Sequence, residues 1–293
     1  MELRPGLHRI ETEFEGVPLA LYLLRGEDGF TLVDSGCAFM VGPVIERYLA
    51  GLGAKLADVR LVVNTHEHFD HAGGNAALAR AGAEIAASEA AVPWIEDHER
   101  AVREYHLFPE IMGYTREYLD KMAAWMGEEA PVTRVLRPGD VLLAGDYNLE
   151  VYAAPGHSAG GIFLHERQAG LLLTGDALQG EGLRLANGAA LAPEYRDLAA
   201  YRSTLALAAS LEAQMLLPSH FPPQDIERAR RFLADCAAAT ERLGRQVAAI
   251  LALGERSLRG ASERAASALG YEFGLELVTS VWQHAREAGI ELA

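Results

Sequence analysis

Three histidines and one aspartate lie close together in the segment Thr-His-Glu-His-Phe-Asp-His-Ala-Gly-Gly-Asn, which spans residues 65–75. They are His66, His68, Asp70 and His71. Imidazole and carboxylate groups are ligands that suit zinc, iron or manganese. Because alternate residues of an extended chain point to the same side, His66 and His68 can bind one ion, and Asp70 and His71 then turn toward a second. The spacing therefore predicts a two-metal site.

The flanking sequence predicts how this segment is positioned. Residues 60–64, Arg-Leu-Val-Val-Asn, form a short apolar run rich in β-branched side chains, which is typical of a buried strand. Two glycines then interrupt the chain, and a helix is expected over residues 75–81. The candidate ligands therefore lie where a strand ends and a helix begins, a common place for sites in layered α/β folds.

Three further candidate ligands follow short apolar runs later in the chain. His157 comes after Val-Tyr-Ala-Ala-Pro-Gly, Asp176 after Leu-Leu-Leu-Thr-Gly, and His220 after Met-Leu-Leu-Pro-Ser. A lone histidine at a strand end is more often a hydrogen-bonded structural residue than a ligand. Three strand-end ligands that follow the histidine-rich segment favour one shared metal site instead.

Together these motifs resemble those of the metallo-β-lactamase-fold hydrolases, and residues 65–75 look most similar to the glyoxalase II and thioesterase branch. The resemblance covers about residues 5–222 and implies an α/β fold, the αββα sandwich. It also implies a role for each ligand: a first metal is bound by His66, His68 and His157, a second by Asp70, His71 and His220, with Asp176 bridging both and Asp34 supporting the metal-binding loops. One departure is Ser219-His220-Phe221, where the family usually has a Gly-His-Gly-like context.

The chemistry that this resemblance implies is metal-assisted hydrolysis. Two divalent ions, Zn2+ first and iron or manganese as alternatives, would share a bridging hydroxide that cleaves a thioester or an ester, as in hydroxyacylglutathione hydrolases. Asp70 and Asp176 are the catalytic carboxylates in this prediction. One alternative is a lactonase with the same metals, although lactonase relatives commonly have Tyr where this chain has Gln179. Another is a metal-binding scaffold or sensor with vestigial turnover.

Composition narrows the partners and the location. The chain has 293 residues, a net charge of −15, 50% hydrophobic and 23% charged residues, which is typical of a globular chain and not of a disordered one. It lacks the basic patches of nucleic-acid-binding proteins, a run long enough to span a membrane, and the start of a signal peptide. Cys37 and Cys236 are therefore expected to be reduced thiols. We expect a cytoplasmic enzyme with a small-molecule ester or thioester substrate and with neither nucleic-acid nor membrane partners.

Apolar runs divide the chain into a metal hydrolase domain over residues 1–222 and a helical extension over residues 223–293. The extension opens with apolar positions at helical spacing over residues 225–253. It is expected to mediate a homodimer or to cover the sandwich, and it lacks the basic cluster expected for glutathione recognition. Strands are expected at residues 17–24, 30–33, 60–64, 84–87, 141–144, 149–153, 161–165, 171–174 and 215–217.

Two segments are candidates for contacting the substrate. Residues 92–127 are helical and rich in aromatic side chains, among them Tyr105, Phe108 and Tyr114. They either pack on the sandwich as ordinary helices or form a lid that walls the substrate pocket, and the lid is the preferred interpretation. The glycine-rich loop over residues 179–188 carries Gln179 and Arg184 and is expected to be mobile and close to the site.

Overall fold

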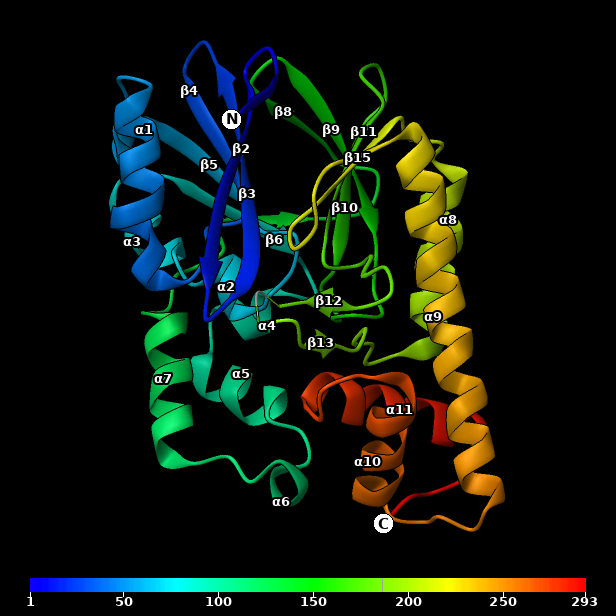
Figure 1. The fold of residues 1–293 in the computed structure, drawn as a ribbon. Helices are drawn as coiled ribbons and strands as arrows, with labels where there is room; N and C mark the ends of the chain where they lie inside the picture. The colour runs from blue at the N-terminus through cyan, green and yellow to red at the C-terminus, as the bar shows by residue number, and fades with distance from the viewer. Residues whose placement is uncertain (186) are drawn as a thin grey trace.

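Two mixed sheets pack face to face, with helices on both outer faces (Figure 1), in a computed structural model that describes residues 1–185 and 187–293. The αββα sandwich expected from the sequence is therefore confirmed. Among the described residues, no helix is long and apolar enough to cross a membrane. Cys37 and Cys236 are both free and buried, as expected for reduced thiols.

The first sheet has seven strands in sequence order, antiparallel from β1 to β4 and parallel from β4 to β7. On β3 the side chains alternate, so that Leu21 and Leu23 face the outer helices while Tyr22 and Leu24 face the second sheet. The strands are β1 (Glu2–Arg4), β2 (Leu7–Phe14), β3 (Val17–Gly26), β4 (Gly29–Val33), β5 (Val59–Val63), β6 (Glu84–Ser88) and β7 (Arg134–Leu136).

The second sheet has six strands in the order β15-β14-β11-β10-β9-β8, and only the β11–β14 pair is parallel. A separate two-stranded ribbon, β12 (Leu183–Arg184) with β13 (Ala190–Leu191), follows β11 in the chain. The six strands are β8 (Val141–Ala144), β9 (Tyr147–Ala153), β10 (Ile162–Glu166), β11 (Leu171–Gly175), β14 (Met215–Pro218) and β15 (Gln224–Asp225).

Helices cover the outer faces of the sheets and one end of the sandwich (Figure 1). The first sheet is covered by α1 (Arg47–Gly51) and α3 (Asn75–Arg80), and the second by α8 (Leu198–Ser210) and α9 (Ile226–Ala252). At the end of the sandwich lie the short helices of the aromatic stretch and the last two helices: α2 (Phe69–Ala72), α4 (Val92–Ile95), α5 (His98–Tyr105), α6 (Pro109–Met112), α7 (Arg116–Met126), α10 (Leu258–Leu269) and α11 (Leu275–Glu287).

The C-terminal helices share one hydrophobic core with α8 and the outer face of the second sheet. Phe163 and Leu172 of the sheet pack in the same cluster as Phe232 of α9 and Val281 of α11. Gly244 lets α9 approach α11 closely, because a Cβ there would lie 2.9 Å from the His284 ring. The helical extension thus covers the sandwich, as expected, while its independence as a domain beyond residue 222 stays a prediction.

Candidate metal centre

The seven candidate ligands all come from loops that follow strand ends, as the sequence predicts. The segment from His66 to His71 follows β5, His157 follows β9, Asp176 directly follows β11, and His220 lies two residues beyond β14. His68 is extended, with φ −66° and ψ 151°, and α2 begins immediately after it. The strand ends of both sheets therefore bring these loops together at one edge of the sandwich.

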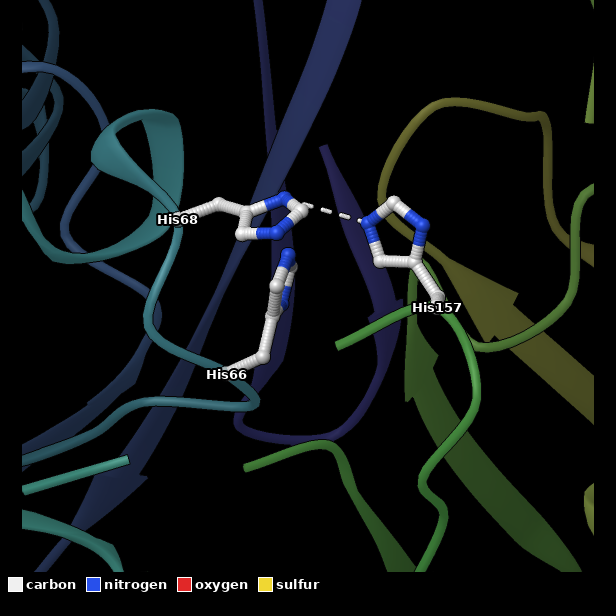
Figure 2. Close-up of side chains that lie close together, drawn as sticks. All are labelled: His66, His68 and His157. Atoms are coloured by element: carbon white, nitrogen blue, oxygen red, sulfur yellow. Dashed lines mark hydrogen bonds between the residues drawn. The ribbon is translucent and has the colours of Figure 1, made fainter. Parts of the chain in front are cut away.

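His66, His68 and His157 form the first of two groups of donor atoms that could hold a metal ion. Figure 2 shows the three imidazoles converging from two loops, with His68 Nδ1 3.1 Å from His157 Nε2. One nitrogen from each ring lies within 4.8 Å of the others, and all three residues are buried. This is the arrangement that three ligands of one ion require.

Asp70, His71, Asp176 and His220 form the second group. His71 Nε2 lies 3.5 Å from Asp70 Oδ2 and 3.3 Å from Asp176 Oδ2. His220 Nε2 lies 3.3 Å and 3.0 Å from the same two oxygens, so the unusual Ser219-His220-Phe221 context still delivers this ring to the site.

Asp176 lies between the two groups. Its Oδ2 is 3.9 Å from His66 Nε2 and 3.8 Å from His157 Nε2, in addition to its contacts with the second group. A single carboxylate therefore reaches donor atoms of both groups, which is the position that a bridging ligand occupies.

The two groups differ in their electrostatics. Burial lowers the pKa of His66 and of His68 well below the usual range, and neighbouring imidazoles lower each further, so these rings are neutral and can donate a lone pair. In the second group, burial opposes charge, yet the aspartates raise the pKa of His71 well above its usual range and that of His220 to about 10. The same imidazoles hold the pKa of Asp70 well below its ordinary value.

The donor atoms are suited to a metal because three of them have no other partner. His66 Nε2, His71 Nε2 and Asp176 Oδ1 are buried without a hydrogen-bond partner among the described residues. Buried polar atoms are normally paired, so orphaned atoms need an explanation. The imidazoles and carboxylates of the two groups match the preferences of zinc, iron or manganese.

Asp34 supports the second group from behind. Its Oδ1 accepts a hydrogen bond from Thr65 N at 2.7 Å, and its Oδ2 accepts from Thr65 Oγ1 and lies within hydrogen-bonding distance of His71 Nδ1, both at 2.9 Å. The backbone of Asp34 is left-handed, with φ +63°, which turns the carboxylate toward these donors. Because Asp34 can accept the proton of His71 Nδ1, Nε2 is left free to bind an ion.

Gln179 supports the first group and does not line the pocket beside His68. Its Nε2 donates to Glu194 O at 2.6 Å, and its Oε1 accepts from Glu194 N at 2.9 Å. The same Glu194 carbonyl lies 3.1 Å from His157 Nδ1, so it can fix the orientation of this ring. The expectation that Gln179 contacts substrate is not supported, because its polar atoms bind the protein.

Residues 193–196, which we call the strap, connect this ligand to the rest of the fold. Ser280 Oγ on α11 donates to Pro193 O at 2.7 Å, and Gln283 on α11 donates to Arg196 O. Arg196 in turn donates to the carbonyls of Glu104 and Tyr105 at the end of α5, at 3.2 and 3.4 Å. The strap therefore joins His157, the aromatic stretch and the last helix.

Of the five residues expected to line the substrate pocket, the structure places Tyr105 beside the metal ligands. Its ring centroid is 4.5 Å from that of His68. Phe108 packs edge-to-face on Trp282, and Tyr114 donates to Leu107 O and stacks on Tyr118. Arg184 is exposed on β12, and neither it nor these two aromatics line the pocket beside His68. Ala186, in the same glycine-rich loop as Arg184, lies outside the described residues.

A pocket of about 470 Å3 opens beside His68. Trp94 of α4 and Tyr105 of α5 form one part of its wall, and Pro155, Gly156, Ala159 and Ala200 contribute small or apolar surface. Its charged lining residues are Glu67, Arg196 and Asp197. Sequence analysis did not single out Arg196 or Ala200, because neither belongs to a motif and only the tertiary fold brings them to His68.

Several curated proteins are similar to this chain in sequence. The acyl-coenzyme A thioesterase MBLAC2 of Homo sapiens is 30% identical over 195 residues, which are 60% of this chain and 64% of that protein. The match thus spans less than two thirds of that relative's length. The hydroxyacylglutathione hydrolase of Maricaulis maris (strain MCS10) is 31% identical over 116 residues, or 39% of this chain and 32% of that enzyme.

The fold and the family are shown by broader matches. A metallo-beta-lactamase family protein from Thermus thermophilus is 26% identical, with a TM-score of 0.74 that covers 98% of this chain and 95% of that one. The model of the "Metallo-beta-lactamase superfamily" matches residues 18–220, which contain all seven candidate ligands. The resemblance noted in the sequence is thereby confirmed, and the chain belongs to the metallo-beta-lactamase superfamily.

Proposed function

We propose that this protein hydrolyses an ester or a thioester with the help of two divalent metal ions, Zn2+ first and iron or manganese as alternatives. The observation that carries the proposal is Asp176, whose Oδ2 lies within 4 Å of imidazoles from both groups of donors. Two ions held in this way would lower the pKa of a water molecule to about 7 and polarise a carbonyl oxygen.

The chain's own residues prepare the site for this chemistry. The neutral imidazoles of the first group present lone pairs without losing a proton first. Asp70 and Asp176 supply the negative charge that favours cations over the second group, and Asp34 keeps His71 in the tautomer that can ligate. The ligands are buried, so water reaches the centre only through the mouth of the site.

The class of substrate is proposed from the relatives and from charge. Two similar proteins carry the names acyl-coenzyme A thioesterase and hydroxyacylglutathione hydrolase, and the net charge of −15 disfavours a polyanion such as RNA. A cytoplasmic location, a homodimer through the helical regions and the lack of nucleic-acid and membrane partners are part of the same proposal.

A metal titration combined with a substrate panel tests the proposal. The apoprotein is reconstituted with Zn2+, its metal content is measured, and hydrolysis of thioester, ester, lactone, phosphodiester and β-lactam substrates is compared. We expect about two ions per chain and the highest kcat/KM for a thioester or an ester. One ion per chain would contradict the two-metal centre, and full occupancy without turnover would favour a metal-binding scaffold.

A further inference from the structure

The pocket beside His68 is the place where part of a substrate can lie while its carbonyl is at the metal centre. His68 belongs both to the first group of ligands and to the pocket wall. With a volume of about 470 Å3, the pocket is within the size range of small-molecule sites, roughly 300–1,000 Å3. It has room for a side group larger than an acetyl methyl.

The wall of the pocket is mainly apolar. Trp94 and Tyr105 pack edge-to-face with ring centroids 6.0 Å apart, so that one part of the wall is aromatic and fixed. Pro155, Ala159 and Ala200 contribute further apolar surface without polar side-chain groups. A group that enters is stabilised by removal of apolar surface from water and not by specific hydrogen bonds.

The charges around the pocket disfavour an anionic group. Arg196 is the only cation among the described lining residues, and it already pairs with Glu194 Oε1 at 3.2 Å and lies over the Tyr105 ring at 4.6 Å. Two of the remaining lining residues, Glu67 and Asp197, are acids. An entering carboxylate or phosphate would therefore meet carboxyl groups and an arginine that is already paired.

We propose that this pocket binds the acyl group of the substrate, and that it selects an uncharged, apolar acyl group of medium length over one that ends in a carboxylate. The proposal rests on the proposed function. A charged leaving group, such as the thiol half of a polar thioester, then lies on the other side of the centre. Specificity at this site resides in Trp94, Tyr105 and Ala200 and not in a motif.

A binding experiment tests the pocket independently of turnover. Uncharged primary amides, from butanamide to octanamide, are titrated into the zinc-loaded full-length protein by calorimetry. We expect Kd to fall about fourfold for each added methylene until the pocket is full, because each one is removed from water. Ala200→Phe should remove this gain, and Ala159→Leu is a second variant at an exposed loop position. Ala199→Phe, on the exposed side of the same helix, is the matched control and should keep the gain.

A kinetic experiment tests the preference for uncharged chains. Thioesters with one common thiol and acetyl, butanoyl, octanoyl or succinyl groups are compared on the same protein. We expect kcat/KM to rise from acetyl to octanoyl, and to be at least tenfold lower for succinyl than for butanoyl, which has the same chain length.

The outcomes of the two experiments separate the inference from the function. Amide affinity that does not depend on length, or succinyl cleaved as well as butanoyl, overturns the inference. Length-dependent amide binding without hydrolysis of any thioester or ester supports the apolar pocket but contradicts the proposed function. Hydrolysis that ignores acyl length retains the function and overturns the pocket's role.

Discussion

Replacing Asp34 with asparagine should weaken the second metal position without unfolding the protein. Asparagine tolerates the left-handed backbone found at residue 34 and can still accept from Thr65 N through its one oxygen. Its NH2 group, however, would take the place of Oδ2, which accepts from Thr65 and can accept from His71. The threonine hydroxyl can rotate to accept, but His71 can accept at Nδ1 only by moving its proton to Nε2.

This tautomer shift gives the expected magnitude. Nε2 is the His71 atom that lies 3.3 Å from Asp176 and 3.5 Å from Asp70, so a proton there blocks the ligand atom itself. Loss of a hydrogen bond behind a metal ligand typically weakens metal affinity 10- to 100-fold, which corresponds to about 1.4–2.8 kcal/mol. We therefore expect the second Zn2+ dissociation constant to rise by that factor and the first to remain unchanged.

A competition titration of the apoprotein with Zn2+ and a chromophoric chelator resolves the two constants. Asp235→Asn is the matched control, because this aspartate is exposed on α9. Two wild-type dissociation constants in Asp34→Asn would refute the tautomer argument. A rise only in the first constant would mean that Asp34 acts on His66 through Thr65 instead.

Three further predictions concern other residues. His220→Ala should reduce metal content toward one ion per chain and lower kcat steeply, while His165→Ala on β10 should leave metal content unchanged; normal stoichiometry in His220→Ala would show that another group completes the site. Gln179→Leu should weaken the first Zn2+ about tenfold, because Glu194 then positions His157 alone, and titration of the first ion measures this. Burial lowers the pKa of His284 to about 4, so the neutral ring stabilises the fold above pH 6.5, and up to about 3 kcal/mol of this is lost as pH falls from 6.5 to 4. Chemical denaturation across this range should show a smaller slope in His284→Gln, and an equal slope would contradict the assignment.

The sequence predicted the strands whose side chains are buried on both faces, and it missed those with a mixed pattern. All nine expected strands exist, and β11, which is entirely buried, matches its expected bounds to within one residue. In contrast, β2 is buried over Leu7–Ile10 but carries His8 and Arg9 there, so its apolar pattern is broken. Short edge strands such as β7 and β15 have too few residues to show any periodicity.

The ligands were predictable because each lies in a local motif, whereas the pocket was not. His66 and its neighbours occur within one short segment, and the family resemblance supplied the distant members of the set. Phe108 was expected in the pocket on the basis of its type, but it packs on Trp282, which lies 174 positions further along the chain. Contacts of this kind depend on how α6 and α11 meet, and single-sequence patterns do not contain that information.

The strap gives the last helix a structural role that is remote in sequence from the residue it affects. Ser280 and Gln283 hold residues 193–196, and Glu194 within them can fix the ring of His157. An exchange of α11 between relatives would therefore also have to exchange the strap, or the imidazole would lose its orientation. Functional chimaeras should accordingly tolerate crossover points between β15 and α10 poorly, even though this region contains no candidate metal ligand.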